Sequence, residues 1–272
     1  MLFLKNKNIL ITGASRGFGA RLAKKLWDEG ANLFLTATQS WDVDFVQKYD
    51  SQKYVIFPFD LSRENVGGLF FKFLFYFNNI YGLINNAAIQ SPIGNMLDME
   101  QYVILNQWEK SFDVNLYAPI KLMIQFGKIM IRQGHGKIIN MSGGGATSSR
   151  PGFSAYATAK TGLVRFSEIF SDEIIGKGVD VNCVAPGAMN TGMQKEILQS
   201  DGSPEKDIRV AKKTLEKTNT MDKPIELVKW LLSEKSDGVT GKLISAVWDD
   251  WTLLEDKTHA KKLYTLRRVD YA

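Results

Sequence analysis

The stretch KIINMSGGGATSSRPGFSAYATAKT, residues 137–161, contains a short apolar run, a glycine-rich loop and the start of an amphipathic segment. The apolar run over residues 137–141 predicts a strand, and the helical spacing of apolar residues from Ser154 onward predicts a helix. A strand that leads through a loop into a helix is the repeating unit of an α/β fold. Tyr156 and Lys160 stand four residues apart, so they share one face of that helix.

This spacing suits proton chemistry. A phenol with a pKa of about 10 needs roughly 4 kcal/mol of preferential phenolate stabilisation to act near neutral pH. One ammonium about 4 Å away contributes on the order of 4 kcal/mol at an effective dielectric constant of about 20, so Lys160 suffices in principle. The same spacing also occurs in helices where the tyrosine is half-buried and the lysine solvated, so the pair by itself leaves both interpretations open.

The composition indicates one α/β domain over residues 1–272 in a reducing compartment, with cytoplasm as the default. The single cysteine, Cys183, excludes an intramolecular disulfide, and the opening residues have too short an apolar run for a signal peptide. The net charge of +5 is modest, and no nucleic-acid-binding module accompanies it. The basic residues cluster in the tail, where they predict a solvated or partner-covering segment: Lys257, Lys261, Lys262, Arg267 and Arg268.

The most apolar stretch, LFFKFLFYF at residues 69–77, is well short of the roughly 20 residues that span a bilayer, and it contains Lys72. It predicts a helix buried in the core or at a subunit interface, without membrane association.

A glycine-rich turn joins the first predicted strand, residues 8–12, to a helix that ends at Gly30. Gly13 permits a tight turn, Gly17 lets the backbone approach a pyrophosphate, and Gly19 lets the helix pack on the strand. The helix amino terminus presents free N–H groups to phosphates. Because the glycines follow a strand and open a helix, they predict a dinucleotide site.

The second strand, residues 32–36, ends in TATQS, which lacks the acidic residue that a NAD-preferring site usually uses to bind the ribose 2′-hydroxyl. Arg16 and Thr38 suit a 2′-phosphate, so NADP(H) is favoured and NAD(H) remains possible, while an ordinary surface arginine is the alternative for Arg16. After a third strand at 53–57, Asp60 either contacts the adenine edge or caps a helix.

Further elements follow in α/β alternation. A strand at 81–84 runs into NNAA, a longer connection covers 91–106, and a helix at 108–130 contains Asn115, which either has a structural hydrogen-bonding role or belongs to a proton path. A strand at 179–184 ends in a small-residue loop, and residues 192–223 predict a flap over a ligand or an exposed insertion. A helix at 224–233 and a strand at 242–247 complete a Rossmann-like, doubly wound parallel sheet flanked by helices, with its cleft at the strands' carboxyl ends.

The chain resembles the short-chain dehydrogenase/reductase family in TGASRGFG, NNAA, Asn115 in its helix, YATAK and PGAMNT, which occur in the family's order from about residue 7 to 247. The resemblance implies NAD(P)-dependent interconversion of a carbonyl and an alcohol on a small-molecule substrate, in a homodimer or homotetramer. Tyr156 would protonate the carbonyl oxygen, Lys160 would lower its pKa and bind the nicotinamide ribose, and Asn115 would hold a water relay. TATQS with Arg16 looks most like the NADP-using acyl-carrier-protein ketoreductase branch.

The predicted catalytic residues are therefore Tyr156, Lys160, Asn115 and Ser142, and no metal is expected. Besides Tyr156 and Lys160, the expected cofactor contacts are Gly13, Ser15, Arg16, Gly17, Phe18, Gly19, Ala37, Thr38, Asp60, Leu61, Asn86, Ala87, Ala88, Pro186, Gly187 and Thr191.

One departure from the family pattern concerns the substrate-orienting serine. Counting back from Tyr156 puts Gly143 in that position, one residue after Ser142. Successive strand residues point to opposite faces, so Ser142 can replace the missing serine only if the chain is irregular there. A second departure, Ala88 in place of a glycine, is mild, and residues 248–272 extend past the usual end, where they are expected to cover a neighbouring subunit. The alternative function is an NADP-binding sensor or structural subunit with weak or no catalysis.

Overall fold

The computed structural model describes residues 2–38, 53–256 and 263–266. Within them, seven strands form one sheet in the order β3-β2-β1-β4-β5-β6-β7, and every neighbouring pair is parallel. The predicted doubly wound parallel sheet is thus confirmed. The strands are β1 (Asn8–Thr12), β2 (Asn32–Ala37), β3 (Tyr54–Pro58), β4 (Gly82–Asn85), β5 (Gly136–Met141), β6 (Val179–Ala185) and β7 (Lys242–Ser245).

The strand order reverses between β1 and β4, because the chain moves outward from β1 to β3 and then returns to the other side of β1. In an open parallel sheet, ligands bind outside the carboxyl ends of the strands at such a switch point. The glycine-rich turn after β1 and the NNAA segment after β4 meet at this position.

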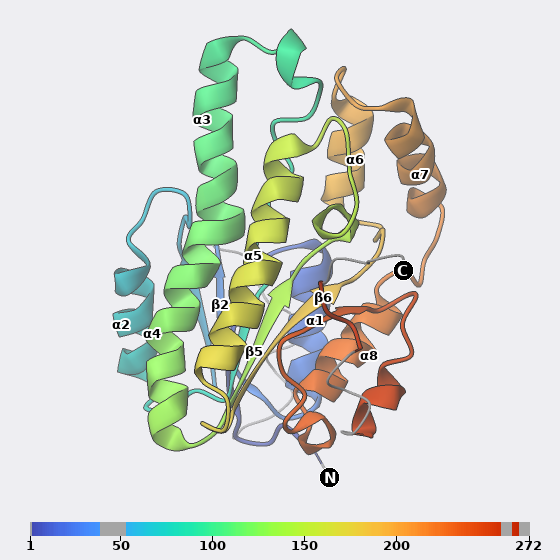
Figure 1. Ribbon diagram of the computed structural model, residues 1–272. Helices are drawn as coiled ribbons and strands as arrows, with labels where there is room; N and C mark the ends of the chain where they lie inside the picture. The colour runs from blue at the N-terminus through green and yellow to red at the C-terminus, as the bar shows by residue number, and fades with distance from the viewer. Residues whose placement is uncertain (1, 39–52, 257–262, 267–272) are drawn as a thin grey trace.

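Helices cover both faces of the sheet, as Figure 1 shows. The helices of the described residues are α1 (Gly17–Asp28), α2 (Val66–Tyr76), α3 (Gln101–Phe112), α4 (Ala118–Gln133), α5 (Ser154–Glu173), α6 (Gly192–Gln199), α7 (Glu205–Leu215) and α8 (Asp222–Leu231). Both faces of a sheet covered in this way must be apolar, and the strands accordingly read as nearly continuous apolar runs.

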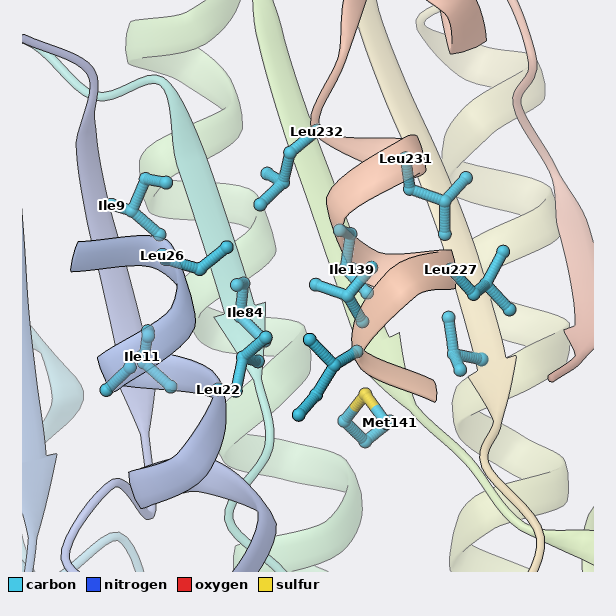
Figure 2. Close-up of a cluster of buried hydrophobic side chains, with 14 of the residues drawn as sticks. Ile9, Ile11, Leu22, Leu26, Ile84, Ile139, Met141, Leu227, Leu231 and Leu232 are labelled. Atoms are coloured by element: carbon cyan, nitrogen blue, oxygen red, sulfur yellow. The ribbon is translucent and has the colours of Figure 1, made fainter. Parts of the chain in front are cut away.

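Alternate residues of β1 enter different cores. Ile9 and Ile11 face α1 and α8, where Leu22 and Leu227 are fully buried (Figure 2). Leu10 faces the opposite side, in the cluster that includes residues of α2, α4 and α5. This alternation follows from the two-residue period of a strand, and it fixes which helices lie on which face.

Two sequence expectations between β4 and β5 are wrong. The connection expected at 91–106 is helical from Gln101, and the single helix expected at 108–130 consists of α3, a π turn η3 (Asp113–Tyr117) and α4. The turn contains Asn115, whose amide bonds the backbone of Ile89 outside the helix. π turns inside α-helices are frequent at functional sites. The contact between Asn115 and Ile89 joins residues far apart along the chain, so it leaves no local sequence signal.

Helix α2 is buried on one face only, so the expectation of a core helix is half correct. Leu69 and Phe73 are fully buried, whereas the side chains of Phe71 and Phe75 are 71% and 77% exposed. The alternative, a subunit interface, stays a prediction. No helix within the described ranges is long and apolar enough to cross a membrane.

The described parts of the tail pack on their own chain. Leu254, in the short 3-10 helix η6 (Trp251–Glu255), is fully buried, and the Leu243 amide of β7 donates to the carbonyl oxygen of Tyr264 at 2.7 Å. Covering of a neighbouring subunit stays a prediction. The five basic tail residues named above lie outside the described residues.

Candidate active site

A cavity of about 710 Å³ lies at the carboxyl ends of the strands. Its walls come from the segments that follow β1, β2, β3, β4, β5 and β6, and from α5, α6 and α7. Each cofactor contact expected from the sequence lines it: Gly13, Ser15, Arg16, Gly17, Phe18, Gly19, Ala37, Thr38, Asp60, Leu61, Asn86, Ala87, Ala88, Tyr156, Lys160, Pro186, Gly187 and Thr191. Of the expected catalytic residues, Ser142 also lines the cavity, and Asn115 is buried behind its wall.

The glycine loop is tightly packed against the segment after β4. Gly13 has φ +66° and a Cβ there would lie 2.7 Å from the Cα of Ala87, so the tight turn predicted for Gly13 is confirmed. A Cβ on Gly19 would collide with the Gly13 carbonyl oxygen and lie 2.5 Å from Nδ2 of Asn86. The Asn86 side chain in turn donates to the carbonyl oxygens of Thr12 and Gly13. The glycines therefore bring two loops together at the switch point.

The amino terminus of α1 fits a phosphate group. Arg16 at its N-cap makes no side-chain capping bond, and the first turn contains no acidic residue. The uncapped N–H groups and the helix dipole thus face the cavity without a competing carboxylate on the helix. The Arg16 side chain is 82% exposed, and its Nη2 lies 3.8 Å from Oε1 of Glu196 on α6.

Asp60 lines the cavity and also closes a local turn. Its Oδ1 accepts hydrogen bonds from the backbone N and the hydroxyl of Ser62, at 2.9 and 2.7 Å. Burial works to raise the pKa of Asp60, but these bonds together with the nearby Arg63 and Lys110 charges lower it. The helix-cap interpretation of Asp60 is wrong, because Asn65 is the N-cap of α2 and Asp60 closes a turn that precedes it. The adenine contact stays a prediction.

Asn115 is fully buried and uses its amide to tie the π turn to the loop after β4. Its Nδ2 donates to the carbonyl oxygen of Ile89 at 2.8 Å and to the Ser111 hydroxyl at 3.1 Å, and its Oδ1 accepts from the Ile89 amide at 3.3 Å. The structural hydrogen-bonding role is confirmed. A water relay stays a prediction.

Lys160 and Tyr156 lie side by side at the cavity floor. The Lys160 Nζ donates to the carbonyl oxygen of Met141 at 2.7 Å and lies 5.9 Å from the centre of the Tyr156 ring. Burial lowers the pKa of Lys160 to about 8 and raises the pKa of Tyr156. In this arrangement burial therefore outweighs the depression of the Tyr156 pKa that the sequence led us to expect from Lys160.

Gly143, rather than Ser142, faces the tyrosine. A Cβ built on Gly143 would lie 2.9 Å from the Tyr156 hydroxyl oxygen, and the Gly143 backbone is extended, with φ −171° and ψ 168°. Neighbouring residues in an extended chain point to opposite sides. The Ser142 hydroxyl is buried and has no hydrogen-bond partner among the described residues. The irregular backbone that Ser142 would need to take over the serine position is thus not present.

Two cavity residues were not predicted from the sequence, Arg150 and Asp207. Arg150, in the loop after β5, donates from Nε and Nη2 to Oδ1 of Asp207 on α7, at 3.1 and 2.9 Å. Both residues line the cavity. No local motif marks either of them, since they are 57 positions apart and meet only in the fold.

The segment expected to be a flap forms α6 and α7, and both helices border the cavity. Ile197 of α6 and Ala211 of α7 are buried against Phe153, which precedes α5. The segment is therefore packed against the residue that precedes α5, unlike a merely exposed insertion. Its function as a flap stays a prediction.

Comparisons with known proteins agree with this arrangement. Residues 7–202 match the family model of the short chain dehydrogenases. The chain is 30% identical over 249 residues to the 3-oxoacyl-[acyl-carrier-protein] reductase of Chlamydia muridarum, covering 89% of this chain and 96% of that protein. It is 29% identical over 245 residues to nodulation protein G of Rhizobium sp. (strain N33), covering 90% and 96%. The chain belongs to the short-chain dehydrogenase/reductase family, and it is an oxidoreductase of a family that uses NAD(P)(H) and acts on small molecules.

Solved structures share the fold. The crystal structure of levodione reductase aligns with a TM-score of 0.77 at 24% identity, covering 89% of this chain and 96% of that one. A short chain dehydrogenase from Escherichia coli CFT073, solved with NADPH, aligns with a TM-score of 0.76 at 21% identity, covering 90% and 99%. At these identities the likeness establishes the architecture alone.

Proposed function

We propose that this chain is an NADPH-dependent carbonyl reductase in which Tyr156 is the general acid. The observation that carries the proposal is the convergence of the glycine loop, Tyr156 and Lys160 on one cavity at the switch point of the sheet. Tyr156 and Lys160 on α5 lie far along the chain from the amino terminus of α1, which fits a phosphate group. A cofactor that extends from α1 to α5 would contact both.

The chain's own residues supply binding and the proton. The reduced nicotinamide, when bound, supplies the hydride. The Tyr156 hydroxyl makes no hydrogen bond within the described residues, so its proton is available to a carbonyl oxygen in the cavity. Lys160, fixed by the Met141 carbonyl, is positioned to bind the nicotinamide ribose and to favour the phenolate left after proton transfer. Asn115 keeps the loop after β4 in place and, in this proposal, holds the water that returns the proton.

Selection of NADP(H) over NAD(H) is proposed to depend on Arg16 and Thr38. Both residues line the cavity, and Ala37, where an acidic residue would select NAD(H), ends β2. The Arg16 guanidinium is exposed and only loosely paired with Glu196, which leaves its fork of donors available to a 2′-phosphate.

The substrate class is best approached through the relatives. Because the Chlamydia muridarum relative is named a 3-oxoacyl-[acyl-carrier-protein] reductase, 3-ketoacyl thioesters are the first class to test, followed by keto-sugars and quinones. Purified protein is mixed with NADPH and each compound, and the decrease in NADPH absorbance is recorded. Turnover that disappears in Tyr156→Phe supports the proposal, and turnover that survives the substitution contradicts it.

A second candidate function is an NADP-binding sensor or structural subunit with little turnover, and Gly143 is the observation that favours it. A lost donor to the developing oxyanion is worth about 100- to 1,000-fold in rate. If Ser142 nevertheless replaces the missing serine, Ser142→Ala lowers kcat at least tenfold with little change in NADPH binding. If Ser142→Ala leaves kcat unchanged and the wild-type turnover is itself negligible, the sensor or structural-subunit function is favoured.

We further propose a homodimer or homotetramer, located in the cytoplasm. Exposed apolar side chains lie on neighbouring elements of one side of the sheet: Tyr117 in the π turn, Ile124 on α4 and Ile169 on α5. Light scattering after size-exclusion chromatography gives the mass, and Ile124→Glu with Ile169→Glu is expected to dissociate the assembly if these helices form the interface.

A further inference from the structure

Two cations lie at nearly equal distance from the ring of Tyr156. The Nζ of Lys160 is 5.9 Å from the ring centre, and the guanidinium carbon of Arg150 is 6.0 Å from it. Lys160 is the partner that the sequence spacing indicates, one helical turn away on α5. Arg150 reaches the ring from the loop after β5 and has no role in the function proposed above.

Arg150 is held in this position by two contacts. Its guanidinium stacks 3.7 Å from the centre of the Phe153 ring, and Nε and Nη2 both donate to Oδ1 of Asp207. The side chains of Arg150 and Asp207 are 26% and 19% exposed, so the pair is partly shielded from water. Since two of the five guanidinium N–H groups bond to Asp207, the others remain for groups in the cavity.

The two cations differ in how firmly they hold their charge. Lys160 is 1% exposed and its ammonium is poorly solvated, so burial favours the neutral amine. A guanidinium stays charged at every pH at which the protein is folded. Near and above pH 8, Arg150 is therefore the more constant source of positive charge beside Tyr156.

We propose that Arg150 is a positioning residue of the reaction, whose fixed charge stabilises the phenolate form of Tyr156. This inference rests on the proposed function of Tyr156 as the acid. Asp207 moderates the effect, because its carboxylate offsets part of the guanidinium charge while it holds the group in place.

The other charged groups around the cavity do not reproduce this arrangement. Burial raises the pKa of Tyr156, and the Arg150 charge is the influence that opposes this rise. Glu196 on α6 pairs with Arg16, and Lys110 lies close enough to Asp60 to lower its pKa at the other side of the cavity. Among the described residues, the remaining titratable groups that line this part of the cavity are Lys160 on α5 and Lys206 on α7. Cys183 is fully buried on β6, outside the lining, and is near enough to Lys160 to influence its pKa.

The test compares two substitutions that break the same ion pair from opposite sides. Arg150→Gln removes a positive charge that lies 6.0 Å from the ring centre and favours the phenolate, so the Tyr156 pKa rises. Asp207→Asn leaves the guanidinium with a neutral acceptor, so the Tyr156 pKa falls. If the ion pair between Arg150 and Asp207 had only a structural role, both substitutions would shift the Tyr156 pKa in the same direction.

Tyr156 is titrated in the full chain by 13C NMR of ring-labelled tyrosine, with the signal assigned by its loss in Tyr156→Phe. This measurement needs no substrate, so it is independent of whether the proposed function is correct. Where turnover is established, the alkaline limb of the reduction rate is expected to move to higher pH in Arg150→Gln and to lower pH in Asp207→Asn, because the acid must be protonated. Arg150→Lys keeps the positive charge, so it should retain most of the wild-type dependence of the reduction rate on pH.

Arg21 and Asp222 form a matched control, because they pair at 2.7 Å outside the cavity. Arg21→Gln and Asp222→Asn should leave the Tyr156 signal unmoved. An unshifted Tyr156 pKa in Arg150→Gln, or shifts in one direction in both Arg150 and Asp207 variants, overturns the inference. If Arg150→Gln does not fold, the inference is tested by Asp207→Asn alone: a fall in the Tyr156 pKa supports it, and a rise or no change overturns it. Failure of the proposed function would instead appear as turnover that survives Tyr156→Phe.

Discussion

The proposed cofactor end of the cavity and its proposed catalytic end are built from different kinds of contact. At the cofactor end, main-chain atoms approach each other where glycines allow it, as Gly13 does against Ala87 and Gly19 against Asn86. At the catalytic end, side chains from separate segments converge, with Arg150, Tyr156 and Asp207 arriving from a loop and two helices.

This difference determines how each end tolerates change. A backbone contact depends on residue size, so any Cβ in the wrong place disrupts it, whatever its chemistry. A side-chain constellation depends on charge and hydrogen bonding, so an isosteric substitution can remove function and leave the fold intact. The four predictions below test this contrast at one end or the other.

Tyr156→Phe is expected to have the largest effect, a loss of kcat of about 1,000-fold or more, because no proton donor remains at the carbonyl. NADPH affinity, measured by fluorescence titration, should change little. Tyr102→Phe, at an exposed position on α3, is the control and should retain full activity. Near-wild-type turnover in Tyr156→Phe would remove this tyrosine from the mechanism.

Gly19→Ala tests the backbone contacts of the cofactor end. The added Cβ would press on the Gly13 carbonyl and on Asn86, so the free energy of unfolding should fall by about 2 kcal/mol and NADPH binding should weaken with it. Gly68→Ala on α2 is the matched control, since its Cβ meets only Phe59 at 4.0 Å and alanine favours a helix. Urea denaturation of both variants measures the contrast, and equal stabilities would contradict it.

Ala37→Asp tests a change of charge at the same end. A carboxylate at the end of β2 would repel a 2′-phosphate and accept a bond from a 2′-hydroxyl, so the ratio of NADPH to NADH affinity should fall by about tenfold or more. Calorimetric titration with both cofactors measures the ratio, with Ala37→Asn as the uncharged control. Equal affinities for NADPH and NADH in the wild type would already refute the predicted preference.

Lys160→Met is expected to have the smallest effect of the four substitutions. It should raise the free energy of unfolding, whereas Gly19→Ala should lower it. The pKa of Lys160 in the folded chain, about 8, lies below its ordinary value of 10.5, so charging it destabilises the fold fully below pH 8 and ever less as pH rises toward 10.5. Methionine removes this penalty but leaves the Met141 carbonyl without its partner, so a net gain of about 1 kcal/mol is expected at pH 7. A gain that does not shrink between pH 8 and pH 10 would exclude this origin.

Much of the fold follows from local sequence. The apolar runs and the glycine after β1 predict alternating strands and helices, and the ends of most elements lie within a few residues of those predicted. The division of one long helix by a π turn was not predicted, and the bond that Asn115 of this turn makes to Ile89, 26 positions away, leaves no local pattern. Helix α2 is buried in the core on one face only, since a run of aromatic residues does not reveal which of them the chain's own elements will cover.

The sequence by itself determined the alternation of strands and helices, the dinucleotide-type turn and the helical spacing of Tyr156 and Lys160, because each depends on residues only a few positions apart. Only the tertiary structure decided that Gly143 faces the tyrosine while Ser142 turns away, and that Arg150 meets Asp207 beside it. Spacing along one helix or strand fixes direction through a known period, whereas contacts between distant segments depend on how whole elements pack. No local pattern encodes that packing.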